Sequence, residues 1–67
     1  MVGRVKSFDS RKGYGFIIGN DGHEYFVHYQ DIAKNGFKIL FQGEKVTFDC
    51  IQEAKGRAAY NVKETNT

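Results

Sequence analysis

The sequence has one cysteine, no proline and no tryptophan among its 67 residues. A lone Cys50 can form neither an internal disulfide framework nor a cysteine metal cluster. No apolar run approaches the ~20 residues needed to span a bilayer. Residues 1–4 lead directly into alternating sequence, without the apolar segment of a signal peptide. We therefore expect a protein of the cytoplasm with no membrane contact.

Helical periodicity is also lacking, because no segment keeps apolar residues at helical spacing for long. Short alternating runs between turn residues predict strands instead. The predicted strands span residues 3–8, 12–19, 24–29, 45–51 and 57–63. Without a helix to cover a sheet face, five short strands favour a sheet closed on itself. The sequence predicts an all-β protein, a small five-stranded Greek-key barrel, as a single domain whose residues 64–67 form a frayed tail.

The loop between the second and third predicted strands fixes their register. Residues 20–22 read Asn-Asp-Gly, which fits a three-residue hairpin loop with Gly22 at a positive φ. Such a loop sets three cross-strand pairs: Gly19 with His23, Phe16 with Phe26, and Tyr14 with His28.

The interior of so small a barrel is too narrow for a ligand. It is predicted to be filled by inward-facing apolar residues: Val5, Ile17, Val27, Ile32, Val46, Phe48 and Val62. Cys50 has the same inward parity on the fourth strand. Function must then reside on the outer surface.

Aromatic residues are abundant, with six phenylalanines and four tyrosines. A domain of this size hides only ~60% of the surface that its unfolded chain exposes. We therefore do not expect it to keep aromatic rings on its surface unless they have a function. With a period of two, one face of the second and third strands carries Tyr14, Phe16, Phe26 and His28. The opposite face carries Gly13, Gly15, Ile17, Tyr25, Val27 and Tyr29 and suits the core. The rings are therefore predicted to face outward.

Three explanations of this face remain open. A register slip of one residue would exchange the two faces and make the rings core. The rings could instead form a protein-interaction or dimer patch, because exposed apolar patches mark contact surfaces. The third explanation is a stacking platform for single-stranded nucleic acid, in which each base stacked on a ring contributes ~1–3 kcal/mol.

The charge pattern favours the third explanation. Ten Lys and Arg residues against eight Asp and Glu give a net charge of only +2, which permits an anionic partner without requiring one. The positions of the cations are more informative. The rings are bordered by Lys6, Lys12 and Lys38, with Lys34, Lys55 and Arg57 at the rim. Lysines at the border can follow a phosphate backbone while the rings take the bases.

Nothing in the sequence supports an enzyme, a metal site or a cofactor. The two histidines, His23 and His28, have no cysteine or carboxylate at the spacing of a ligand set or a catalytic triad. His23 reads as a solvated loop residue.

Two separate motifs resemble a known family. Residues 12–17, "KGYGFI", and 25–29, "YFVHY", resemble the first and second ribonucleoprotein motifs of the cold-shock domain family of bacterial cold-shock proteins. Further similarity includes "GRVKSF", "DG", "NGFK", "GEKVTF" and "AAYNV", and runs from Gly3 to Val62. The resemblance implies a barrel of the OB-fold type that binds single-stranded RNA and DNA, prefers pyrimidine-rich strands, and acts as an RNA chaperone in cold or stress adaptation and gene regulation. A monomer is expected, with a dimer as the alternative.

The resemblance also implies particular binding residues. They are Lys6, Phe8, Lys12, Tyr14, Phe16, Phe26, His28, Tyr29 and Phe37, with Glu24 where the family often has an aspartate. The bordering Lys38 joins this set. Tyr29 has inward parity, so its place on the surface requires the strand to end or bend there.

The sequence departs from the family pattern at five positions. Ser7 stands where the family has a tryptophan, and the loss of one ring is expected to weaken binding by roughly ten- to hundredfold. Asp9 replaces an asparagine, Tyr25 an aliphatic residue, Arg57 a proline and Tyr60 a small residue. Ser7, Lys55, Arg57 and Tyr60 complete the candidate site.

Overall fold

The computed structural model describes residues 1–33, 39–54 and 56–65. It contains five strands and one 3-10 helix: β1 (Val2–Asp9), β2 (Tyr14–Gly19), β3 (Glu24–His28), η1 (Tyr29–Asp31), β4 (Lys45–Glu53) and β5 (Gly56–Glu64). β2 begins two residues later than predicted, and the last two strands are longer than predicted. No helix in the described part of the chain is long and apolar enough to cross a membrane.

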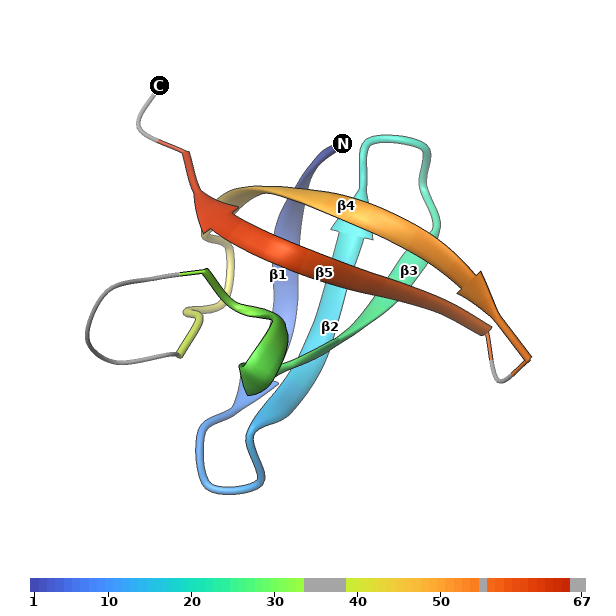
Figure 1. Ribbon diagram of the computed structural model, residues 1–67. Coiled ribbons are helices and arrows are strands. Elements are labelled where there is room, and N and C mark those ends of the chain that lie inside the picture. Colours follow the sequence, from blue (N-terminus) through green and yellow to red (C-terminus); the bar gives the residue numbers. More distant parts are fainter. Residues whose placement is uncertain (34–38, 55, 66–67) are drawn as a thin grey trace.

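The strands close into a barrel in the order β1-β2-β3-β5-β4 (Figure 1). Neighbouring strands are antiparallel except β3 and β5, which are parallel. The five-stranded barrel predicted from the alternating runs is therefore confirmed. β5 continues through Glu64, and the backbone N–H of Thr65 donates to the carbonyl of Lys45 at 3.1 Å.

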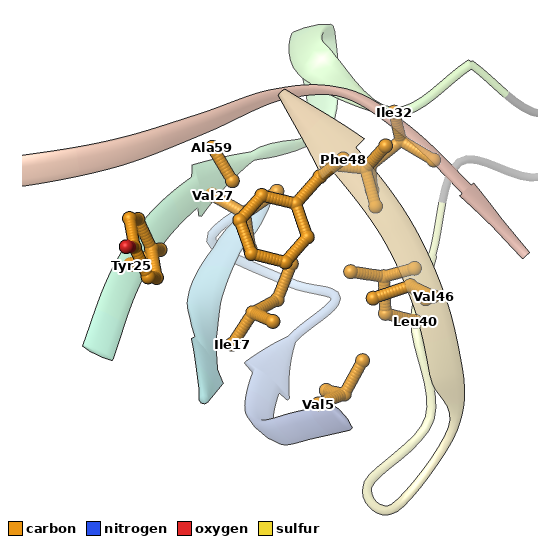
Figure 2. Packing of buried hydrophobic residues seen from close by; sticks show 10 residues of the cluster. Val5, Ile17, Tyr25, Val27, Ile32, Leu40, Val46, Phe48 and Ala59 are labelled. Carbon is orange, nitrogen blue, oxygen red and sulfur yellow. The ribbon is translucent and has the colours of Figure 1, made fainter. Parts of the chain in front are cut away.

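The core fills the barrel interior (Figure 2). All seven predicted core residues are buried, and Tyr25, Leu40 and Ala59 join them. The ring centroids of Tyr25 and Phe48 are 5.1 Å apart. Because side chains fill the interior, it has no room for a ligand, and a ligand must bind on the outer surface.

A bulge in β1 changes which residues face outward. Val5 pairs with Ile17, whereas Ser7 pairs with the adjacent residue Phe16, so Lys6 is the extra residue. After the bulge the parity is reversed. Ser7 therefore shares the outer face with Phe16, and Phe8 turns toward the core.

A second bulge lies in β5. Asp49 pairs with Tyr60 and Thr47 with Lys63, which leaves one extra residue on β5. Asn61 has a φ of 53°, a left-handed conformation that asparagine tolerates better than most residues. Its side-chain amide donates to Asp49 Oδ2 at 3.3 Å. Because of the extra residue, Ala59 and Val62 both face inward although they are three positions apart in the sequence. Tyr60, between them, lies at the surface.

The prediction that Cys50 faces the interior is wrong, because its thiol is exposed. Its parity is inward, since it pairs with buried Ala59. However, β4 is exposed at every residue from Asp49 to Glu53. The outer ends of β4 and β5, residues 51–53 and 56–58, extend past β3 as a hairpin that we call the arm (Figure 1). Cys50 lies at the base of this arm, beyond the packed interior.

Candidate nucleic-acid interface

Aromatic rings gather on the outer surface of β2 and β3. The register pairs Tyr14 with His28 and Phe16 with Phe26, as the hairpin loop predicts. The Phe26 centroid lies 5.6 Å from that of Tyr14 and 5.9 Å from that of Phe16. We call these four residues the ring face.

The ring face belongs to the surface and not to the core. Phe26 is 39% exposed, and the other three side chains are half-buried. The alternating residues Gly15, Ile17 and Val27 are buried instead. A one-residue slip of register is therefore ruled out.

Glycine at position 15 allows β1 to approach β2 closely. A Cβ built on Gly15 would lie 2.2 Å from the carbonyl oxygen of Ser7 and 2.6 Å from the Cα of Phe8. No larger residue fits this contact without a shift of backbone. Phe8, which the resemblance places in the site, packs against the core and also lines a surface hollow with Ser7, Tyr14 and Phe16.

The end of β3 brings His28 and Tyr29 together. The strand ends at His28, whose Nδ1 accepts a hydrogen bond from the backbone N–H of Gln30 at 3.4 Å. The chain then turns into η1, so Tyr29 leaves the inward parity of the strand and is exposed. The two rings are 4.6 Å apart at their centroids. Tyr29 thus continues the ring face beyond the strand.

Among the described residues, two lysines that border the ring face differ in whether they form an ion pair. Lys6, the extra residue of the β1 bulge, forms an ion pair with Glu24 of β3. Lys12 is exposed in the loop between β1 and β2. Asp9 Oδ1 orders that loop by accepting from the backbone N–H groups of Arg11 and Lys12, at 2.9 and 3.0 Å. Lys6 is thus partly neutralised within the protein, whereas Lys12 presents its charge to solvent.

The arm adds charged groups beside the rings. A surface hollow, which we call the arm hollow, lies between the start of β3 and the arm. Its lining is Phe16, Gly22, His23, Glu24, Phe26, Glu53, Gly56, Arg57 and Ala58. Arg57 is thereby brought next to the ring face. No pattern in the sequence marks Glu53, because its position depends on how far β4 extends beyond the barrel.

Tyr60 lies apart from the arm hollow. It is 44% exposed and lines another hollow with Gln30, Asp31 and Asn61. The β5 bulge therefore places Tyr60 beside residues of η1. The predicted residues Lys34, Phe37, Lys38 and Lys55 lie outside the described part of the chain.

The hairpin loop is fixed by a buried tyrosine. Tyr25 donates its hydroxyl proton to Asp21 Oδ2 at 2.5 Å, and the backbone N–H of His23 donates to Asp21 Oδ1 at 3.1 Å. The hydrogen bond to Asp21 raises the pKa of Tyr25 to about 12. The same bond lowers the pKa of Asp21 below its usual 3.8. This contact anchors the loop that forms one wall of the arm hollow.

Within 1–33, 39–54 and 56–65, no three His, Cys, Asp or Glu side chains gather as a potential metal site.

A closed five-stranded barrel with an aromatic outer face and bordering lysines defines a small β-barrel of the OB-fold type. The family model of the "'Cold-shock' DNA-binding domain" matches residues 1–65. The chain belongs to this family of nucleic-acid-binding domains.

Several bacterial proteins are similar over almost the whole chain. "Cold shock protein 1" of Lactiplantibacillus plantarum is 52% identical over 60 residues, covering 90% of this chain and 91% of that protein. "Cold shock protein CspC" of Bacillus subtilis is 48% identical over 61 residues, covering 91% and 92%. A "Cold shock-like protein" of Thermotoga maritima is 48% identical over 63 residues, covering 94% and 96%.

Proposed function

We propose that the chain binds single-stranded RNA and DNA with little sequence selectivity, by stacking unpaired bases on the ring face. The observation that carries this proposal is the spacing of Tyr14, Phe16 and Phe26, whose neighbouring centroids lie within 6 Å on an outer surface. A base offers a π-face of similar size to each ring. Lys12 beside these rings is available to a phosphate.

The biological role that fits this surface is that of an RNA chaperone. Bases held on the rings are withdrawn from pairing with one another, so binding favours the melted form of a transcript by mass action. The names of the similar proteins support a role in cold adaptation. We extend this role to stress adaptation and to the regulation of gene expression. We assign this activity to the cytoplasm and to a monomer without catalytic activity, with residues 1–67 acting as one domain.

Single strands should bind better than duplex, because duplex bases must unstack before they can reach a ring. Among single strands, pyrimidine-rich sequences are expected to bind best, a preference taken from the family. The candidate contacts are the ring face with Lys6, Ser7, Phe8, Lys12, Glu24, Tyr29, Phe37, Lys38, Lys55, Arg57 and Tyr60.

A titration followed by intrinsic fluorescence tests the proposal. The chain has four tyrosines and no tryptophan, and Tyr14 and Tyr29 lie at the candidate surface. Heptamers of uridine or thymidine should quench this fluorescence at low salt, and the thymidine strand should bind more weakly once annealed to its complement. Equal affinity for single strand and duplex would contradict the proposal. A concentration-dependent dimer with no response to any strand would instead favour the protein-interaction alternative.

A further inference from the structure

Another surface hollow, which we call the basic hollow, lies where the start of β1 meets β2 and β4. Its lining includes Val2, Arg4, Ile18, Asn20 and Lys45. Arg4 pairs with Ile18 on β2 and with Lys45 on β4. Residues that pair directly point to the same face of a sheet. The two cations and the isoleucine therefore face outward together across three neighbouring strands.

The direct pairing of Arg4 with Lys45 brings two like charges together. Side chains directly opposite in an antiparallel pair have Cβ atoms about 5 Å apart, and like charges at that spacing are destabilising. Neither cation forms an ion pair within residues 1–33, 39–54 and 56–65. An anionic partner bound between them would relieve this repulsion.

The carboxylates around the basic hollow are directed elsewhere. Glu24, opposite Ile18 on β3, is held in the ion pair described above. Glu44 turns to its own loop, where its Oε1 accepts from the backbone N–H of Phe41 at 3.0 Å. Glu64 pairs with Val46, whose side chain faces the core, so it leaves β5 on the other face from Lys45. The hollow therefore presents its cations to solvent.

Arg4 is also held in position for a ligand. Its Nη1 donates to the carbonyl of Gly43 at 3.1 Å, and the side chain is otherwise exposed. A guanidinium has five N–H donors in a fixed fork, so this bond leaves donors for a second acceptor. Guanidinium groups bind phosphate oxygens through such paired donors. Lys45, which is half-buried, adds a point charge opposite.

The basic hollow continues the ring face along β2. Ile18 is the next outward residue of this strand after Phe16, about 7 Å further along it. Beside Ile18, the ion pair of Lys6 with Glu24 joins β1 to β3 across β2 and adds no net charge. A nucleic-acid strand that leaves Phe16 in this direction runs directly onto Arg4. This continuity favours nucleic acid over an acidic peptide as the partner.

We propose that the basic hollow is a phosphate-binding surface, in which Arg4 and Lys45 hold the backbone of a strand that runs on beyond the ring face. This inference rests on the proposed function and extends its surface from β2 and β3 onto β1 and β4. The lining described for the hollow has no aromatic ring. Its contribution is therefore one of charge, which depends on salt and not on the identity of the bases.

The test compares a uridine heptamer with a uridine undecamer over a range of salt concentrations. The heptamer is expected to be taken up by the ring face and its border, whereas the undecamer extends past them. On the undecamer, Arg4→Gln and Lys45→Gln should each make the slope of log K against log [salt] shallower by roughly 0.7 for the phosphate contact removed. On the heptamer, both variants should keep the wild-type slope.

The readout is the slope because a longer strand also offers more registers, which raises the affinity of every variant alike. Charge-conserving substitutions are the matched controls. Arg4→Lys and Lys45→Arg each retain a cation and should keep the wild-type slope on the undecamer. Circular dichroism verifies the fold of all four variants.

Each outcome decides the inference. A shallower undecamer slope in both glutamine variants, with the wild-type slope kept in the controls, supports it. An undecamer slope unchanged in either glutamine variant overturns it while the proposed function stands. A heptamer slope reduced by the same amount also overturns it, because the cations would then act on any strand from a distance.

Two further results complete the test. Binding of a heptaglutamate peptide that both glutamine variants abolish, with their undecamer slopes unchanged, would assign the hollow to an acidic protein and overturn the inference. Failure of the wild-type chain to bind either uridine strand overturns both the inference and the proposed function.

Discussion

Gly13 and the ring of Tyr29 are in direct contact, and the backbone joins them as well. The N–H of Tyr29 donates to the carbonyl of Gly13 at 2.7 Å. A Cβ built on Gly13 would lie only 2.7 Å from Cδ1 of Tyr29, and the residue has a φ of 77°. The loop after β1 thus supports the aromatic residue that extends the ring face.

Gly13→Ala should therefore weaken both stability and binding. The left-handed conformation alone costs an alanine roughly 1–2 kcal/mol, and the Tyr29 ring must also move. Chemical denaturation measures the first effect and strand titration the second. Gly43→Ala is the control, because Gly43 has a similar φ of 84° but no atom within 4 Å of its built Cβ, and it lies outside the candidate site. If the two variants bind equally well, the contact with Tyr29 does not orient the site.

Phe16→Ala and Phe26→Ala should each weaken strand binding by about 1–3 kcal/mol, because each removes one stacking ring. The loss should persist at high salt, since stacking releases few counterions. Phe48→Ala serves as the core control and should cost about 3–5 kcal/mol of stability. If Phe16→Ala unfolds the domain while any folded fraction binds fully, Phe16 has a structural role only.

Lys12→Ala should act through charge. Its affinity loss should appear mainly at low salt, and the slope of log K against log [salt] should become shallower by roughly 0.7 for one lost phosphate contact with a single strand. Lys63→Ala, far from β2 and β3 along β5, should leave the slope unchanged. An unchanged slope in Lys12→Ala would remove this lysine from the phosphate path.

Ser7→Trp should tighten binding by about 1–3 kcal/mol, because it adds a ring to the platform. Ser7 is exposed opposite Phe16 and lines a hollow with Phe8 and Tyr14, so the side chain has space. Ser7→Leu adds apolar surface without a π-face and should gain less. Equal gains in the two variants would mean that contact area and not stacking is responsible.

Tyr25→Phe should destabilise the domain in a pH-dependent way. The pKa of Asp21 is lowered on folding, so the stabilisation is present above 3.8 and is lost as the pH falls. The pKa of Tyr25 is raised to about 12, so the stabilisation is complete below 10.0 and is lost as the pH rises toward 12. Denaturant unfolding of both proteins across this range measures the difference.

The control for this prediction is the same substitution in an Asp21→Asn background. There the hydroxyl has no carboxylate partner, and the difference between Tyr25 and Phe should no longer follow the pH in the acid range. A difference that is constant from acid to alkaline pH in the original background would contradict the assigned hydrogen bond.

Alternation alone predicts the barrel, the core and the outward ring face, because these depend on a period of two and on one well-marked hairpin loop. The bulges are harder to foresee. Nothing in the alternation marks Lys6 or Asn61 as an extra residue, yet those two positions decide where Ser7 and Tyr60 point. The prediction that Cys50 faces the interior fails for a related reason. Parity gives the side of the strand and not whether the barrel still encloses it.

The residues of the candidate site also differ in how far the sequence predicts them. Tyr14, Phe16, Phe26 and His28 follow from parity, whereas Tyr29 follows from resemblance and from the end of β3. Glu53 follows from neither, because it depends on the length of the arm and on its distance from β3. Long-range geometry of this kind has no local sequence signal.

If bases stack on the ring face as proposed, the junction of β3 with β5 couples that binding to the integrity of the barrel. Phe26 is both a ring of the proposed binding surface and the β3 member of the pair that joins these strands, and Ile32 and Val62 form a further parallel bridge beyond η1. A strand stacked on Phe26 would hold this seam closed. Thermodynamic linkage then requires the converse: a change that raises the population with an open seam must lower the apparent affinity for nucleic acid.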